Sequence, residues 1–160
     1  MSNFFEKSDL TRKDAERIIS DTLNKCDDGE LYLEELKSEN ILLDDNKIKS
    51  SKYNSDLGFG FRAISNDIVA YSHSNEISMD SLKKSSKNLN STLKSANGTY
   101  NHEIPNTNKK YYENTNPIEQ KDLNSKLKIL NQVNEYLRSK DSNVKQVTTS
   151  FSGEQKSIEI

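Results

Sequence analysis

Apolar and polar residues alternate along this chain with two different periods, and each period predicts a different kind of element. In three segments apolar side chains recur every three or four residues, as one face of a helix requires. We therefore expect helices from Thr11 to about Cys26, from Ser78 to about Leu93, and from about Glu119 to Arg138. Thr11 and Ser78 can cap the first two, and Cys26 continues the first apolar stripe, so it is expected in the core.

Between the first two predicted helices the period falls to two, which is typical of strands. Strands are expected at 30–34, 40–43, 47–53, 57–64 and 68–71. The polar residues 37–39 separate the first two, and turns at 44–46, 54–56 and 65–67 join the others. Such short connections favour antiparallel neighbours. The predicted fold class is α+β, with a mostly antiparallel meander sheet packed by two helices.

Residues 58–63 alternate glycine with phenylalanine and end in Arg-Ala. In a strand, both phenylalanines would lie on one face, and both glycines and Arg62 on the other. Alternate glycines suggest that something approaches that face closely. A helix packed on the sheet is the first expectation, and a neighbouring subunit or a bound peptide is the alternative. Gly58, Gly60 and Arg62 are therefore candidate substrate-binding or interface residues, although a half-buried arginine more often pairs with a carboxylate.

The chain is expected to divide near residue 95. Asparagine, proline and glycine dominate the following stretch, so we predict an N-terminal α+β domain at 1–95, a linker at 96–118 and the start of a second domain at 119–160. The β-branched stretch 144–151 predicts a strand, and Ser152–Gln155 a hairpin turn. The chain would then end inside a hairpin, which suggests a truncated helix–hairpin unit and a fragment of a longer protein.

Composition argues against several classes of function. The 23 basic and 25 acidic residues are mixed along the chain, so no nucleic-acid-binding surface is visible. Apolar runs are too short to cross a membrane, and the N-terminus has no signal-peptide pattern. The single cysteine cannot form an internal disulfide, which agrees with a reducing compartment. A cytoplasmic protein is expected, with neither nucleic acid nor membrane as a partner.

Motifs that perform chemistry are absent from these 160 residues. His73 and His102 lie in different segments, and together with Cys26 they would form a zinc site only by coincidence of folding. No serine lies in a glycine-flanked elbow, and no dinucleotide or phosphate loop occurs. We therefore assign no catalytic residue and no metal ligand.

Several stretches, taken in order, resemble the TldD/PmbA metalloproteases, and the TldD branch more than the PmbA branch. The resemblance begins at Asp28–Glu34, passes through Leu43–Lys49 and is strongest at Gly58–Ala63. It continues at Ala70–Ser74 and, beyond the predicted linker, at Val144–Gly153. Apart from about ten N-terminal residues and the stretch 95–110, it covers the chain.

The resemblance implies a protease of two subunits around a central cavity, which cleaves unfolded or short peptides. TldD-type members carry zinc on an H-E-x-x-x-H helix, with a cysteine ligand nearer the C-terminus. The region resembled here would contribute to dimerisation and to the peptide cavity. No H-E-x-x-x-H motif occurs in this sequence, so zinc is a cofactor of the family without ligands in this chain, and the chain alone is expected to be inactive.

Two hypotheses follow for partners. The chain is either the N-terminal region of a TldD-like zinc metalloprotease, paired with an identical or a paralogous subunit, or a stand-alone, non-catalytic binding or assembly module that pairs with a full-length TldD/PmbA paralogue.

Overall fold

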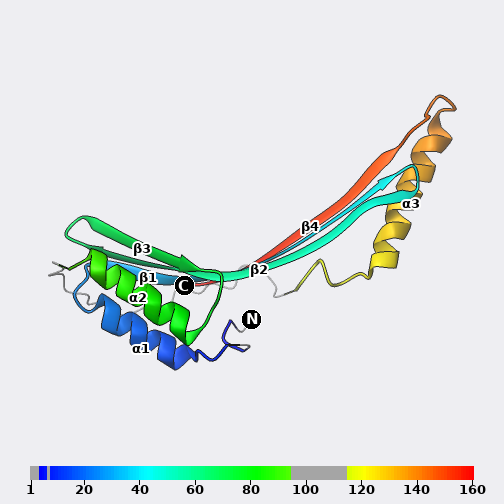
Figure 1. The fold of residues 1–160 in the computed structure, drawn as a ribbon. Helices are drawn as coiled ribbons and strands as arrows, with labels where there is room; N and C mark the ends of the chain where they lie inside the picture. Colours follow the sequence, from blue (N-terminus) through cyan, green and yellow to red (C-terminus); the bar gives the residue numbers. More distant parts are fainter. Residues whose placement is uncertain (1–3, 7, 95–114) are drawn as a thin grey trace. The chain divides into compact units, whose positions relative to one another are not determined.

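The computed structural model describes residues 4–6, 8–94 and 115–160. In chain order the elements are α1 (Arg12–Leu23), β1 (Asp28–Asp44), β2 (Lys47–Ser65), β3 (Ile68–Ser74), α2 (Met79–Thr92), α3 (Leu123–Lys140) and β4 (Thr148–Glu159) (Figure 1). The strands form one sheet in the order β3-β2-β1-β4. The predicted α+β class, with an antiparallel meander sheet, is confirmed. None of the helices in the described ranges is long and apolar enough to span a bilayer.

Two compact units make up the chain, and neither is continuous in sequence. Unit 1 contains Met1–Glu35, Asp56–Glu113 and Ser157–Ile160, and unit 2 contains Leu36–Ser55 and Asn114–Lys156. The strands β1 and β2 contribute to both units. The continuous domains expected from the sequence divide the chain at other places, and most of the expected linker, 96–114, lies outside the described residues.

In unit 1, α1 and α2 pack on one face of the sheet. The predicted caps are confirmed: Thr11 Oγ1 accepts a hydrogen bond from the Asp14 amide at 3.1 Å, and Ser78 Oγ accepts one from the Ser81 amide at 3.3 Å. The core between the helices and the sheet is built by apolar side chains from both layers, which include Ala15, Ile18, Leu23, Leu31, Leu33, Phe59, Phe61, Leu82 and Leu89. Cys26 belongs to this core, as predicted.

Small side chains connect the layers of unit 1. Thr22 Oγ1 of α1 and Ser86 Oγ of α2 lie 2.7 Å apart, and Ser72 Oγ of β3 donates to Ser85 Oγ at 3.0 Å. Because these hydroxyls form hydrogen bonds with one another, α2 lies close to α1 and to β3 without leaving the hydroxyls unpaired.

In unit 2, α3 packs on the part of the sheet that this unit contains. Ile41, Leu43 and Leu130 form its core, with Leu127 and Phe151 against them. The helix begins at Leu123 rather than near Glu119, because Asp122 is its cap and accepts from the Ser125 amide at 2.9 Å.

Three predicted interruptions of strands are wrong. Segments 37–39 and 54–56 lie inside β1 and β2, and Ser152–Gln155 lies inside β4, so the chain does not turn back there. The true turns hold the only described non-glycine residues with positive φ, namely Asp45, Asn46, Asn66 and Asp67. Two successive positive φ angles fit the right-handed twist of a hairpin, and Asn and Asp tolerate them better than most residues.

Candidate functional site

Gly58, Gly60 and Arg62 lie on the face of the unit 1 sheet opposite α1 and α2. The helices cover Phe59 and Phe61, whose side chains are 5% and 0% exposed. The expectation that a helix packs on the glycines is therefore wrong. Burial of two phenylalanines stabilises by several kcal/mol, on the order of 2 kcal/mol each, and this decides which face the helices cover.

The neighbour that requires the glycines is β3. A Cβ atom at Gly60 would lie 2.7 Å from Tyr71 Oη, and one at Gly58 would lie 2.6 Å from the Ser74 carbonyl oxygen. In the antiparallel register, Arg62 is opposite Tyr71 and Gly60 is opposite His73. The Tyr71 ring thus lies diagonally across the strand pair and occupies the space above Gly60.

Arg62 is held by two carboxylates of β1. Its Nε donates to Glu30 Oε1 at 3.0 Å, and its Nη2 lies 3.4 Å from Asp28 Oδ2. About a third of the arginine side chain remains exposed. The pairing fixes the direction of the guanidinium and offsets its charge, while a role for Arg62 in binding stays a prediction.

Aromatic side chains complete this surface, which we call the open face and define by Glu30, Tyr32, Gly60, Arg62, Tyr71 and His73. The Tyr71 and His73 rings are stacked, with centroids 5.9 Å apart and planes 26° apart. Tyr32 Oη donates to Glu34 Oε2 at 2.5 Å. This hydrogen bond, followed by burial and the carboxylate charge, raises the pKa of Tyr32 to about 12.

Sequence reasoning missed the three aromatic residues of the open face. A signal for them exists, because Tyr32 alternates with the buried Leu31 and Leu33, and Tyr71 follows the buried Ala70. Strict alternation assigns both tyrosines to the face away from the core.

Two of the candidate zinc ligands, Cys26 and His73, lie in different parts of unit 1. Cys26 is 2% exposed in the core, with Sγ 3.7 Å from the Thr22 carbonyl oxygen, and burial beside Asp27 raises the pKa of its thiol. His73 belongs to the open face, and His102 lies outside the described residues. Over residues 4–6, 8–94 and 115–160 no three His, Cys, Asp or Glu side chains group as metal ligands would.

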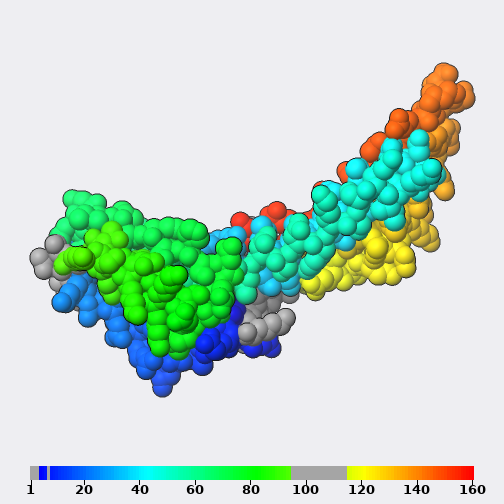
Figure 2. All heavy atoms as spheres, in the orientation of Figure 1, coloured from blue at the N-terminus to red at the C-terminus, as the bar shows by residue number. Residues whose placement is uncertain are grey.

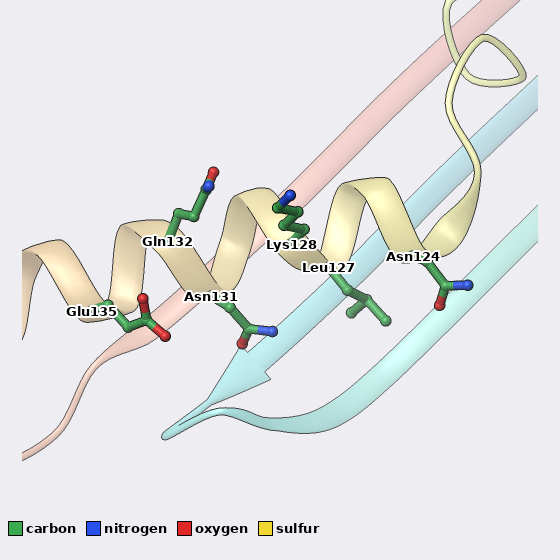
Figure 3. Close-up of a pocket in the computed structure, with 6 residues that line it drawn as sticks. All are labelled: Asn124, Leu127, Lys128, Asn131, Gln132 and Glu135. Atoms are coloured by element: carbon green, nitrogen blue, oxygen red, sulfur yellow. The ribbon is translucent and has the colours of Figure 1, made fainter.

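Unit 2 offers a shallow recess along α3. Its lining comes from one helix and is rich in amides: Asn124, Leu127, Lys128, Asn131, Gln132 and Glu135 (Figure 3). The lining contains no serine, threonine, cysteine or histidine, and all six residues come from α3, so the recess does not suggest a reaction.

Comparison with known proteins places this fold in a family. Residues 29–95 match the profile of PmbA/TldA metallopeptidase domain 1. The Metalloprotease TldD homolog of Buchnera aphidicola subsp. Acyrthosiphon pisum (strain APS) is 33% identical over 135 residues, which are 84% of this chain and 28% of the relative. The homolog from Buchnera aphidicola subsp. Schizaphis graminum (strain Sg) is 27% identical over 154 residues, 95% of this chain and 32% of that protein. The chain thus spans about a third of the length of these relatives.

Solved structures share the fold. A proposed modulator of DNA gyrase from Thermotoga maritima MSB8 matches with a TM-score of 0.56 at 12% identity, over 92% of this chain and 38% of that one. Another from Bacteroides thetaiotaomicron VPI-5482 matches with a TM-score of 0.55 at 15% identity, over 92% and 39%. The chain belongs to the TldD/PmbA metallopeptidase family and corresponds to the N-terminal portion of its members.

Proposed function

We propose that this chain is the substrate-cavity and dimerisation region of a cytoplasmic TldD-like zinc metalloprotease that acts on unfolded or short peptides. The observation that carries the proposal is the match to a TldD homolog along 84% of the chain but only 28% of the relative. Because H-E-x-x-x-H does not occur in the 160 residues, the zinc-binding residues belong to a part of the protease that this sequence does not contain.

The open face supports contact with a peptide. Tyr71 is 65% exposed and the hydroxyl end of its ring lies over Gly60, so the ring offers an aromatic surface to an apolar side chain. Arg62 is oriented by Glu30 and Asp28 and still has a third of its side chain exposed. An exposed aromatic ring beside a guanidinium held by two carboxylates can bind many peptide sequences, because stacking and charge-assisted hydrogen bonds to carbonyl groups require no particular side chain.

Peptide cleavage tests the catalytic half of the proposal. The purified chain, incubated with zinc and an unfolded fluorescent peptide, is expected to leave the peptide intact. Cleavage by the chain alone, retained after repeated purification, would contradict the assignment of the catalytic residues to another part of the protease.

Peptide binding tests the cavity role. Fluorescence anisotropy of the same peptide should show saturable binding that Tyr71→Ser weakens. The matched control is Tyr136→Ser, because Tyr136 is 59% exposed on α3 of unit 2. Equal affinity of wild type and Tyr71→Ser, or loss of affinity in the control alone, would remove the open face from the cavity.

The alternative is a stand-alone, non-catalytic module that pairs with a full-length TldD/PmbA paralogue. The absence of the zinc motif from this sequence is as consistent with the stand-alone module as with a region of a longer protease. Co-expression of the chain with full-length TldD-type and PmbA-type proteins distinguishes the two. A stable complex that changes the activity of the paralogue would support the module, and separate elution of the chain would count against it.

A further inference from the structure

The strand β3 forms one edge of the sheet. It pairs on one side with Phe59–Ser65 of β2 in antiparallel register, and it is the last strand in the order β3-β2-β1-β4. In the part of the chain that the structure describes, no strand pairs with its other side. In Figure 2 the blue-green atoms of β3 follow one margin of unit 1. The unpaired side of an edge strand presents amide and carbonyl groups that another strand can pair with.

β3 lacks the features that normally protect an edge. Its sequence, Ile-Val-Ala-Tyr-Ser-His-Ser, contains no Asp, Glu, Lys, Arg or Pro. The strand at the other end of the order, β4, contains Glu154, Lys156 and Glu159. Charged side chains oppose pairing with another edge strand, so β4 is protected and β3 is not. β3 exposes Ile68 and Val69, 50% and 57%, and β4 exposes Ile158, 50%, so the difference between the two edge strands lies in their charged residues.

We propose that β3 pairs antiparallel with β3 of a second copy of this chain. The inference rests on the dimerisation role proposed above and names the surface that performs it. Seven residues overlap completely when the two-fold axis passes through the central residue, Tyr71. Tyr71 then lies opposite Tyr71 of the second copy, Val69 opposite His73, and Ala70 opposite Ser72.

The chemistry of these pairs favours a second copy as the occupant. In a two-fold pair the central residue meets itself, so a charged residue there would repel its own copy. The central residue here is an exposed tyrosine, and aromatic or β-branched cross-strand pairs contribute roughly 0.2–1 kcal/mol each. The facing pairs on the helix side are Ala70 with Ser72, which are small, and Ile68 with Ser74 at the ends of the strand. A substrate peptide requires no such symmetry, and it becomes an outcome of the test.

Opposite charges at position 71 provide the decisive experiment. Sedimentation velocity across micromolar concentrations should show a reversible dimer for the wild-type chain. Tyr71→Lys and Tyr71→Glu should each weaken it by at least about tenfold, because like charges meet at the axis. An equimolar mixture of the two variants should restore the dimer, because lysine then faces glutamate. Val133→Lys, which places the same charge on a side chain 42% exposed on α3, should leave the dimer intact.

Circular dichroism identifies variants that fail to fold. Val69→Lys serves as a second variant of the β3 edge. If the wild type dimerises and neither Tyr71→Lys nor Val69→Lys weakens it, the β3 pairing is overturned while the dimerisation role stands. Dissociation by Val133→Lys alone, or a mixture that stays monomeric, also overturns it. A wild-type chain that is monomeric throughout overturns both. If Tyr71→Lys weakens peptide binding but leaves the dimer intact, the β3 pairing is overturned and Tyr71 acts in peptide binding alone.

Discussion

Lys126 of α3 donates a hydrogen bond from Nζ to Glu39 Oε2 of β1 at 2.5 Å, although the two residues are 87 positions apart. The same Nζ donates to the Ile118 carbonyl oxygen at 2.6 Å. The two side chains are only 4% and 11% exposed. A buried ion pair of this kind ties α3 to β1 within unit 2, and it is stabilising only while both charges are present.

Removal of one member of this pair should therefore cost more than removal of both. Lys126→Met is expected to destabilise the chain by about 3 kcal/mol, because Glu39 keeps a buried charge without its partner. The double variant Lys126→Met, Glu39→Met should recover most of that loss. Urea unfolding followed by helix ellipticity measures all three proteins. Additive losses in the double variant would show that the two residues do not act as a pair.

The two glycines of β2 should differ in their tolerance of alanine. A Cβ at Gly58 meets the Ser74 carbonyl oxygen, which is backbone and cannot move away, so Gly58→Ala should cost about 1–3 kcal/mol. At Gly60 the obstacle is the end of the exposed Tyr71 ring, which can swing aside. Gly60→Ala should cost less than about 1 kcal/mol and should cost nothing further in a Tyr71→Ala background. Thermal unfolding tests the order, and a greater loss at Gly60 would contradict it.

Tyr32 should ionise well above the range of an ordinary tyrosine. Its hydrogen bond to Glu34 raises the pKa to about 12. Ultraviolet titration of phenolate should show a late transition from Tyr32, and Glu34→Gln should bring it back toward about 10. Because the folded-state pKa lies above the unfolded one, the stability contributed by this pair is complete below about pH 10 and is lost as pH rises through about 12. An unchanged titration in Glu34→Gln would contradict the assignment.

Asp44 should make the stability of the folded chain depend on pH in the acidic range. Hydrogen bonds from the Gln146 and Thr148 side chains hold the pKa of its carboxyl below the ordinary value, with a further contribution from Lys49. Stability from this group is therefore present above the unfolded value of about 3.9 and declines as pH falls through the lower folded value. Melting temperatures measured from neutral to acidic pH should decline less steeply for Asp44→Asn. Gln146→Ala is the matched control that removes a donor and keeps the acid. Identical pH profiles for the wild type and Asp44→Asn would contradict this role.

The helices could be predicted from sequence because their signals are local. Thr11 and Ser78 lie one residue before α1 and α2, and both caps form as expected. The expected start of α3, near Glu119, lies before the observed one, because Asp122 caps the helix and its carboxylate accepts the Ser125 amide. A cap and an apolar stripe lie within one or two turns of each other, so no knowledge of the rest of the chain is needed.

The lengths of the strands could not be predicted in the same way. Asn54-Ser55-Asp56 has the composition of a turn, yet it lies inside the 19-residue strand β2. Asp45-Asn46 and Asn66-Asp67 have similar composition and do turn. The difference between the segment inside β2 and the two turns comes from pairing with distant segments, which overrides local preference in strands.

The open face shows the same limit. Alternation correctly places Gly58, Gly60 and Arg62 together, but it cannot show that Tyr71 occupies the space above Gly60. That contact depends on the register between β2 and β3 and on the diagonal direction of one side chain.

The division of β1 and β2 between the two units has a consequence during synthesis on the ribosome. Ile41 and Leu43 are synthesised early, whereas Leu130, which covers them in unit 2, is synthesised much later. Asn134, which donates a hydrogen bond to Asn46, follows it by 88 positions in the chain. Until then the tip of the first hairpin has an uncovered apolar surface. We therefore expect chaperones to bind the nascent chain over that interval, and we expect a protein cut after α2 to keep the same surface and aggregate.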